Sequence, residues 1–531
     1  MSHKIALLLQ CRVATARVAK RWTALSAQAK GISGTPLAGE EAIAGPWGVL
    51  FALNRYVDTL IEIERFGAPR LDAKSARRRA SGQVVVDVFP SRPSDRILFN
   101  GVRAEVWMDR GVTLATLHDT MAVWYRQTHR ESRLALVLGA GNISSIPVLD
   151  VLYKLVAEGT ACMLKVHPLT DCLGPVFEEA LAPLVAGGYL RLTYGGAEVG
   201  RYLCSHELID EIHVTGSVAT RDAIAADNAS GKRITSELGN VSPTIVVPGP
   251  WSEADLRFQA DHIATTKLYN NGFNCISSQV LIVPTDWPQR DALVAAVERA
   301  MARVPDRPAY YPGAHARCRS IAGSRAARRY GRSDADFLPR TLVDVDPADL
   351  DDAVFANEAF CPLLAVASLP GNLETYLDRA VDFANRALWG TLAANLIVHP
   401  RSMRDRSDAV DAAIAGLRFG CVGVNAWSGV GFLLAPVPWG AYRSETSEGS
   451  ESGDGVVHNS HLFERTQKAV VHAPFRPFPR SILAGDATLL PQPPWFISHR
   501  NQAKIGEELC KFEAAPTARS LAKIAMLTLT G

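Results

Sequence analysis

The chain has 531 residues, of which 47% are hydrophobic and 21% are charged. It is longer than one hydrophobic core normally organises and carries enough apolar side chains for two or more cores, so we expect a multi-domain globular protein. The 56 Lys and Arg residues nearly balance the 54 Asp and Glu residues, giving a formal net charge of +2 without a long block of one sign. This composition argues against a nucleic-acid-binding protein.

The nine cysteines are scattered and odd in number, and no two of them form a C-x-x-C pair. This pattern argues against a disulfide framework and against a structural zinc site, so we expect no metal. The first apolar stretch, residues 5–9, is too short for the core of a secretion signal, and no window reaches membrane-spanning length. We therefore expect a cytoplasmic protein without an integral membrane segment.

The N-terminal part predicts helices followed by a hairpin. Residues 1 to about 80 have helical patterns that are broken by the Gly- and Pro-containing stretch 31–48. Residues 82–108 contain two runs rich in β-branched side chains on either side of a Pro/Ser/Asp turn. This pattern predicts a β-hairpin, and such an excursion commonly serves as an oligomer contact.

From residue 133 the chain alternates between short apolar runs and helical patterns. The runs that predict strands are residues 134–138, 161–166, 190–194 and 211–215. Continuous apolar strands in alternation with helices are typical of a parallel sheet covered on both faces. The sequence therefore predicts a doubly wound α/β domain of the nucleotide-binding type, with its ligand at the carboxyl ends of the strands.

A second alternating region begins near residue 234. It contains a predicted helix at 253–267, a predicted strand at 279–283, and further apolar runs at 391–400 and 422–427. Residues 443–460 are rich in Ser, Glu and Gly and predict a mobile loop, after which residues 468–479 predict a strand and a Pro-rich tail follows. We expect boundaries that divide the chain into residues 1–236, 237–440 and 441–531.

Cys275 lies in the polar stretch "NNGFNCIS", directly before the apolar run of a predicted strand. A free cysteine usually packs as a small hydrophobe in a core, so a setting rich in Asn and Gly indicates a thiol that is used chemically. A thiolate can attack an aldehyde carbonyl to form a thiohemiacetal, which can lose hydride to a nicotinamide.

Seven short stretches share one order and spacing with a known family: "LGAGN", "MLKV", "HVTGS", "TSELGNVSP", "NNGFNCIS", "NEAFCPLLAV" and "VGVN…PWGAY". Together they resemble the aldehyde dehydrogenase superfamily from residue 134 to residue 442. The resemblance implies an α/β fold with two doubly wound parallel-sheet domains, in which residues 1–236 bind the cofactor and residues 237–440 carry the nucleophile. It also implies a small β element for oligomerisation and assembly as a homodimer or homotetramer.

Three residues match the family's catalytic positions. Cys275 matches the nucleophile, and Asn142 matches the amide that binds the oxyanion together with the Cys275 backbone N–H. Glu237 matches the general base that activates water to hydrolyse the thioester.

Three further stretches match the family's cofactor site. Lys165 matches the lysine that binds the adenosine ribose. Gly216 and Ser217 match the loop between strand and helix that faces the pyrophosphate. Glu358 and Phe360 match the residues that hold the nicotinamide ribose and pack on the nicotinamide.

Three positions depart from the family pattern. NAD-preferring members commonly carry Glu three residues after the lysine, where this chain has Pro168, and His167 stands beside the lysine; we expect NAD or NADP, with NADP slightly favoured. Asn240 replaces a common Gly after Glu237, which puts the packing of the cofactor in doubt. Cys361 replaces the usual Gly after Phe360, and inert filler is a better interpretation of this thiol than an oxidation-sensitive site.

Two enzymatic functions stay open at this point. The first is NAD(P)-dependent oxidation of an aldehyde to its carboxylate, with release of the acyl group by water that Glu237 activates. The second is a CoA-dependent acylating aldehyde dehydrogenase or acyl-CoA reductase, because the Asn-rich context of Cys275 resembles that branch. Glu237 favours water, since those branches usually lack this base.

A non-catalytic protein of the same fold ranks last, because all three matched catalytic residues are present. The Trp- and Phe-containing segment 425–442 predicts an apolar lining of the substrate tunnel and hence an aliphatic or aromatic aldehyde.

Overall fold

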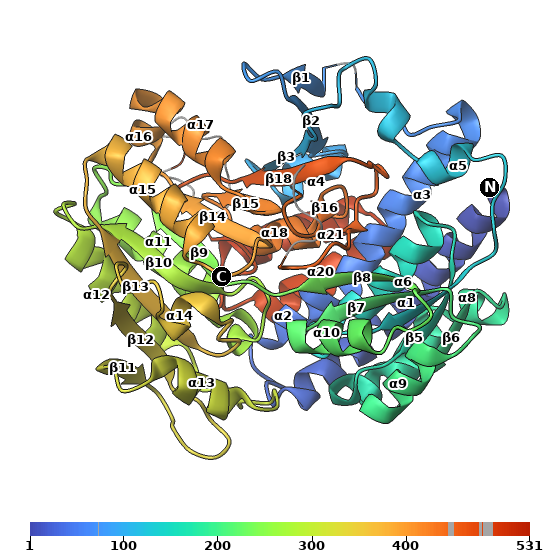
Figure 1. The fold of residues 1–531 in the computed structure, drawn as a ribbon, viewed down its shortest axis with the longest axis horizontal. Coiled ribbons are helices and arrows are strands. Elements are labelled where there is room, and N and C mark those ends of the chain that lie inside the picture. Colours follow the sequence, from blue (N-terminus) through green and yellow to red (C-terminus); the bar gives the residue numbers. More distant parts are fainter. Residues whose placement is uncertain (73, 444–450, 477–480, 482–491) are drawn as a thin grey trace.

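A computed structural model describes the chain except for residue 73 and residues 444–450, 477–480 and 482–491. The described residues form two large β-sheets and one two-stranded sheet, with helices around them (Figure 1). In the view of Figure 1 the smaller sheet lies on the right and the larger sheet on the left. Among the described residues, no helix combines the length and the apolar composition that crossing a membrane requires.

The smaller sheet has five parallel strands in the order β6-β5-β4-β7-β8. These are β4 (Leu134–Leu138), β5 (Ala161–Lys165), β6 (Leu190–Thr193), β7 (Glu211–Gly216) and β8 (Arg233–Leu238). The helices between them are α6 (Ile146–Val156), η3 (Pro168–Leu173), α7 (Gly174–Ala180), α8 (Ala182–Ala186), α9 (Ala197–Ser205) and α10 (Val218–Ala226). The predicted alternation is confirmed. The strand order reverses between β4 and β7, and such a switch point opens a ligand crevice at the carboxyl edge.

The larger sheet has eleven strands in the order β1-β2-β3-β18-β15-β14-β9-β10-β13-β12-β11. In chain order these are β1 (Ala76–Arg78), β2 (Val84–Phe89), β3 (Arg103–Met108), β9 (Ser242–Val246), β10 (Ser278–Pro284), β11 (Ala327–Tyr330), β12 (Arg340–Val345), β13 (Leu363–Leu369), β14 (Ala393–Ile397), β15 (Cys421–Val424) and β18 (Thr466–His472). From β18 to β12 neighbouring strands are parallel, and antiparallel strands flank them on both sides. Parallel strands of this kind need helices on both faces.

The helices around the larger sheet are α11 (Glu253–Leu268), η4 (Tyr269–Gly272), α12 (Arg290–Arg303), α13 (Ala314–Ala322), α14 (Ala353–Ala356), α15 (Leu373–Arg386), α16 (Pro400–Asp405), α17 (Ser407–Gly416) and α18 (Ser428–Leu433). Helix α11 begins at a capping box in which the side chains of Ser252 and Asp255 satisfy each other's backbone N–H groups. It runs into the loop that carries Cys275.

The two sheets meet where β8 passes through residues 239–241 into β9. Glu237 lies near the end of β8, and Cys275 lies directly before β10, which pairs with β9. The carboxyl edge of the smaller sheet therefore faces the amino ends of β9 and β10. This arrangement brings residues from both halves of the chain to one place.

The predicted hairpin is present as β2 and β3, with the short helix α4 (Pro93–Leu98) in place of a simple turn. It joins the larger sheet because β3 pairs with β18, and β18 in turn pairs with β15 of the same chain. The predicted strand at 468–479 is therefore part of this sheet as far as His472, where β18 ends, and its residues 477–479 lie outside the described residues. Use of the hairpin as an oligomer contact stays a prediction, as do the two boundaries that divide the chain into three parts.

The N-terminal helices are α1 (Ser2–Ala29), α2 (Ala38–Ala42), the π-helix η1 (Ile43–Trp47) and α3 (Gly48–Phe66). Further short segments are η2 (Leu117–Thr120), α5 (Val123–Arg126), β16 (Pro438–Trp439) and β17 (Val457–His458). The C-terminal residues, which the sequence predicts as a tail, end in two helices, α20 (Gln502–Ala514) and α21 (Ala518–Leu529), and α20 packs on α2 and η1. Residues 444–450 of the predicted mobile loop lie outside the described residues.

Candidate active site

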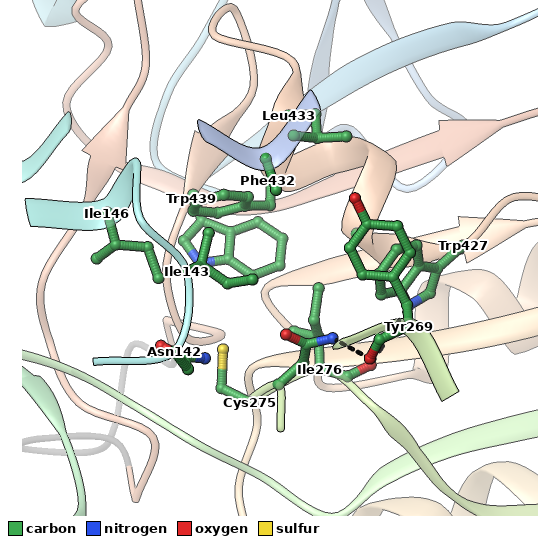
Figure 2. Close-up of a pocket in the computed structure, with 13 residues that line it drawn as sticks. Asn142, Ile143, Ile146, Tyr269, Cys275, Ile276, Trp427, Phe432, Leu433 and Trp439 are labelled. Atoms are coloured by element: carbon green, nitrogen blue, oxygen red, sulfur yellow. Dashed lines mark hydrogen bonds between the residues drawn. The ribbon is translucent and has the colours of Figure 1, made fainter. Parts of the chain in front are cut away.

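An apolar pocket of about 430 Å³ lies between the two sheets. Figure 2 shows the Cys275 sulfur pointing into it beside Asn142, with aromatic side chains around the far end. The lining residues are Ala44, Asn142, Ile143, Ile146, Tyr269, Asn274, Cys275, Ile276, Trp427, Gly429, Phe432, Leu433 and Trp439. None of these lining side chains carries a charge, so the pocket favours an uncharged, apolar group next to the thiol.

The nucleophile loop owes its shape to three consecutive left-handed residues. Asn270, Asn271 and Gly272 have φ values of 51°, 55° and 77°. Asn tolerates this conformation better than other residues with a side chain, and a Cβ at Gly272 would stand 2.6 Å from the Cys361 carbonyl oxygen. The asparagines that made the loop look polar therefore set the turn that presents Cys275.

Asn142 follows β4 at the switch point of the smaller sheet. One of its amide hydrogens goes to the carbonyl of Phe273 at 3.0 Å, which fixes the side chain and leaves the other hydrogen for an oxyanion. The backbone carbonyl oxygen of Asn142 accepts from the Lys30 Nζ at 2.7 Å and from the Asn270 side-chain amide at 3.2 Å. The residue is thus held on both sides, and 6% of its surface stays exposed.

Glu237 is buried behind the pocket. Its Oε1 accepts a hydrogen bond from the Trp439 indole at 2.6 Å, while its Oε2 has no partner among the described residues. Burial, and next the charge of Asp150, raise the pKa of Glu237 to about 8. The carboxyl is therefore largely protonated at pH 7 and becomes a base in the mildly alkaline range.

The surroundings of Cys275 keep its thiol protonated. Burial, followed by the negative charges of Glu237 and Glu358, raises the pKa of Cys275 well above its usual range. The same interactions show that both carboxyl groups lie close to the sulfur. A thiol in this setting needs a proton acceptor at the moment of attack.

Glu358 lies against the backbone where β8 ends. A Cβ at Gly239 would stand 2.2 Å from both carboxylate oxygens, so only glycine leaves room for this side chain. Burial raises the pKa of Glu358 to about 8, and its Oε1 has no partner in the described part of the chain. Phe360, with a left-handed φ of 42°, lies 5.9 Å from the ring of Phe273.

The other predicted cofactor residues follow the carboxyl edge of the smaller sheet. Gly216 ends β7 in an exposed position, and Ser217 caps α10 by accepting from the Thr220 N–H. Lys165 ends β5 and is buried, and burial lowers its pKa. Burial, and then the charge of Lys165, lower the pKa of His167. The structure thus places Lys165 and Gly216 at the carboxyl ends of their strands and Ser217 at the start of α10.

Asn240 does not face this edge. Its amide donates to the Ala393 carbonyl at 2.9 Å, and its oxygen accepts from the Ser242 hydroxyl at 2.8 Å. The Asn240 side chain is therefore hydrogen-bonded within the larger sheet. Its presence does not argue against packing of a cofactor at the edge of the smaller sheet.

Several residues of the site were missed by the sequence reasoning. Asp171 in η3 lies close enough to raise the pKa of Lys165 against the effect of burial, so a carboxylate does stand near this lysine. Trp439 was seen only as part of an apolar segment, and its bond to Glu237 carries no local sequence signal. Tyr269 and Ile146 line the pocket from helical patterns that look like ordinary core.

A buried ion pair behind the loop was also missed. Arg307 donates to both carboxylate oxygens of Glu40 at 2.9 and 2.8 Å, and Glu40 accepts from the Asn270 N–H at 2.9 Å. Because its partners are 267 and 230 positions away from Glu40, only the fold reveals the pair.

Comparison with known proteins agrees with this geometry. Residues 144–322 match the model of the aldehyde dehydrogenase family. The chain is also 28% identical over 388 residues to N-succinylglutamate 5-semialdehyde dehydrogenase 1 of Caulobacter vibrioides, a match that covers 68% of this chain and 75% of the relative. In sequence over these residues, and in fold, this chain is similar to aldehyde dehydrogenases.

Solved aldehyde dehydrogenases show the extent of the shared fold. An indole-3-acetaldehyde dehydrogenase in complex with NAD+ superposes with a TM-score of 0.59 at 17% identity, over 89% of this chain and 84% of that one. The glyceraldehyde-3-phosphate dehydrogenase GapN of Methanocaldococcus jannaschii, in complex with NADP, gives 0.57 at 17% identity over 88% and 90%. The aldehyde dehydrogenase fold thus extends over most of the chain.

Proposed function

We propose that the protein oxidises an apolar aldehyde to its carboxylic acid with NAD or NADP, through a covalent intermediate on Cys275. The observation that carries this proposal is the meeting of one thiol, one held amide and one buried carboxyl at an uncharged pocket. Relatives named as aldehyde dehydrogenases support the reaction class.

The residues present fit a nicotinamide cofactor. Glu358 keeps a buried oxygen without a protein partner among the described residues, which suits a ribose hydroxyl. Ser217 and Gly216 leave the N-terminus of α10 open for a pyrophosphate, and Lys165 and Asp171 stand where an adenosine ribose would bind. The bound cofactor would supply the hydride acceptor.

The first half of the mechanism belongs to Cys275 and Asn142. The thiol of Cys275 gives its proton to ionised Glu237, which passes it on to solvent, as the sulfur attacks the aldehyde carbon. The free amide hydrogen of Asn142 and the Cys275 N–H hold the oxygen that becomes negative. The attack forms a C–S bond, and the carbonyl oxygen then re-forms its double bond as hydride leaves the carbon. The product of this half is a thioester on Cys275.

The second half belongs to Glu237. In its ionised form it takes a proton from a water molecule, whose oxygen attacks the acyl carbon. The C–S bond breaks, the carboxylic acid leaves, and the sulfur regains a proton. The hydrogen bond from Trp439 holds one carboxylate oxygen, and the unpartnered Oε2 is the one free for water.

Release of the acyl group to CoA stays the alternative, because the Asn-rich context of Cys275 resembles that branch. Two observations favour water. Glu237 is present with a buried free oxygen close to Cys275, and the asparagines of the loop have a structural role in its turn. We expect the acceptor to be water.

A panel of aldehydes assayed with NAD and with NADP, each with and without CoA, tests the function. We expect cofactor reduction with apolar aromatic or aliphatic aldehydes in the absence of CoA, and weaker turnover of semialdehydes that bear a carboxylate. Cys275→Ala is the matched control and is expected to be inactive in every arm. Strict dependence on CoA would overturn hydrolysis, and no turnover in any arm would overturn the reaction.

A further inference from the structure

Glu237 has to lose a proton in each turnover of the proposed reaction, although only 2% of its surface is exposed. It takes the proton of the Cys275 thiol in the first half, and it must be ionised again before it can take a proton from water. At that point the acyl group occupies the apolar pocket. The proton therefore needs a route that leads from Glu237 away from the pocket.

A polar cluster lies beside Glu237 on one face of the smaller sheet. In the pairing of β7 with β8, Thr215 stands opposite Glu237 and His213 stands opposite Thr235. Residues two apart on a strand share a face, and neighbouring strands lie about 4.8 Å apart. Asp150 reaches this face from α6, and its Oδ2 accepts from the Thr215 hydroxyl at 3.0 Å. The five side chains therefore form one set in space, although they come from three elements.

The hydrogen bonds of His213 leave one ring nitrogen as a proton acceptor. The Thr235 hydroxyl donates to the Ile212 carbonyl at 3.5 Å, so it accepts from the His213 Nδ1 at 2.9 Å. With its hydrogen on Nδ1, the imidazole keeps a lone pair on Nε2. That nitrogen lies 3.5 Å from the Thr215 hydroxyl oxygen and 3.6 Å from the Asp150 Oδ2. The Thr215 hydroxyl therefore lies beside a free proton acceptor.

Asp150 supplies the charge that stabilises a proton on His213. It is 1% exposed, and its ion-pair partner within the described residues is the His213 imidazole. A buried carboxylate needs a positive neighbour, and a protonated imidazole provides one. Burial lowers the pKa of His458, the other histidine near Asp150, to about 4, so that ring stays neutral. The other titratable groups on which the charge of Asp150 acts are Glu237, Tyr56 and Cys162.

Solvent lies close to the His213 ring. A Cβ at Gly455 would stand 3.2 Å from the His213 Cε1, so the segment 453–455 covers the imidazole. Asp454 in this segment is exposed, and its carboxylate accepts from the Ser236 N–H at 3.0 Å. A proton on His213 is therefore one residue away from water and from a surface carboxylate.

We propose that Thr215 and His213 relay the proton of Glu237 to solvent, with Asp150 stabilising the imidazolium in between. The Glu237 carboxyl gives its proton to the Thr215 oxygen while the hydroxyl hydrogen of Thr215 moves to the His213 Nε2, so Thr215 is unchanged after the step. The imidazolium then releases a proton to water and returns to its neutral form. The relay rests on the proposed function, because it ionises Glu237 again between the two halves of the reaction.

A pH jump followed by infrared spectroscopy tests the relay without substrate. The protonated Glu237 carboxyl has a C=O stretching band, which is identified by its loss in Glu237→Gln. Since burial raises the pKa of Glu237 to about 8, a jump from pH 7 to pH 9 should remove this band. His213→Phe should lose it at least about tenfold more slowly than the wild type, because a positioned group accelerates proton transfer by about 100-fold or more. His262→Phe is the matched control, since His262 is also buried but lies on α11.

Further variants separate the relay from a structural role. Thr215→Val removes the hydroxyl and should slow the loss of the band as His213→Phe does, whereas Thr215→Ser keeps a hydroxyl and should behave like the wild type. Asp150→Asn can still accept from Thr215 but removes a negative charge near Glu237, so the midpoint of the band's titration should move to lower pH. Equal rates in the wild type, His213→Phe and Thr215→Val would overturn the relay.

Rapid mixing with an aldehyde distinguishes the relay from the proposed function. At pH 9 Glu237 starts ionised, so His213→Phe should release its first equivalent of reduced cofactor at the wild-type rate. It should then turn over at least about tenfold more slowly, with the acyl group still on Cys275 in acid-quenched samples. A wild-type steady-state rate would overturn the part of the relay in turnover. Slower loss of the infrared band in a protein that oxidises no aldehyde would support the relay while the proposed function falls.

Discussion

The hydrogen bond between Trp439 and Glu237 sets when the proposed base is ionised. An N–H donor stabilises the charged carboxylate, whereas burial and the charge of Asp150 oppose it, and the pKa of about 8 is the result. Hydrolysis of the thioester should then increase with pH up to about 8 and level off above it.

Trp439→Phe tests this balance. Loss of the donor leaves the carboxylate less stable, so the midpoint of the pH profile should move up by about one unit, since a hydrogen bond to a charged group contributes about 1.5 kcal/mol or more. Single-turnover hydrolysis of the acyl-enzyme, followed from pH 6 to 10, measures the shift.

The reference variant is Glu237→Gln, which should release its first equivalent of reduced cofactor and then turn over slowly without the alkaline limb. An unchanged midpoint in Trp439→Phe, or an unchanged steady-state rate in Glu237→Gln, would contradict the role of Glu237.

We also expect single residues to decide the choice between NAD and NADP. Pro168 stands where the family pattern has a Glu, so the sequence lacks the expected carboxylate at that position. In the structure, Asp171 places a carboxylate near Lys165. A carboxylate there favours NAD, because it accepts from a ribose hydroxyl and repels a 2′-phosphate. This observation weakens the preference for NADP that the sequence suggested.

Asp171→Ser should shift the ratio of kcat/KM values toward NADP by about tenfold, which corresponds to about 1.4 kcal/mol. Steady-state kinetics with both cofactors measure the ratio. Asp222→Ser, an exposed carboxylate on α10 paired with its neighbour Arg221, is the control for a general change in charge. An equal ratio in the wild type and in Asp171→Ser would exclude a role for Asp171 in cofactor choice.

At the scale of elements, α2 supports the nucleophile loop through one buried ion pair. Glu40 is fully buried, holds both nitrogens of Arg307 and accepts from the Asn270 N–H at the left-handed turn. The neighbouring Glu41 accepts from Lys30, whose Nζ also donates to the carbonyl of Asn142. Helix α2 is thus connected to both the loop of the thiol and the amide for the oxyanion.

Glu40→Gln should destabilise the protein by about 3 to 5 kcal/mol, because it leaves the Arg307 charge buried without its partner. Urea unfolding measures the change in free energy. We also expect faster alkylation of Cys275, because the loop loses an anchor. Asp382→Asn is the matched control, since its pair with Arg386 is exposed and contributes about 0.5 kcal/mol or less. Equal effects of the two substitutions would show that the Glu40 pair has no special role.

At the scale of the whole molecule, the C-terminal part of the chain packs against the N-terminal helices. Helix α20 packs on α2 and η1, and η1 contributes Ala44 to the wall of the pocket. The contact is tight: a Cβ at Gly39 would stand 2.3 Å from the backbone carbon of Gln502. The two ends of the chain therefore share one packed unit next to the site.

Gly39→Ala should lower the free energy of unfolding by about 1 to 3 kcal/mol, because the backbone of α20 must shift to admit the methyl group. In a helix without this contact the same substitution would stabilise. Thermal unfolding measures the change, with Gly196→Ala as the control, since a Cβ at that position meets nothing within 4 Å. An unfolding temperature that does not fall in Gly39→Ala would show that α20 can shift without a loss of stability.

Most of the strands and several catalytic candidates could be predicted from the sequence. The apolar runs at 134–138 and 211–215 become β4 and β7 because continuous burial leaves a local pattern of side chains. Cys275 stood out because its neighbours are polar, and the structure shows that these neighbours form the turn. The C-terminal helices were missed because the Pro-rich stretch before them suggested a tail, and their stability comes from packing on α2.

The sequence by itself determined the alternation of strands and helices, the position of the thiol in its turn and the resemblance to a family. These features depend on residues that are neighbours in the chain. Only the tertiary structure decided which groups face the thiol, that Trp439 holds Glu237 and that Asp171 stands near Lys165. Burial and electrostatic interactions depend on distance in space, and these partners are brought together only when the two sheets pack against each other.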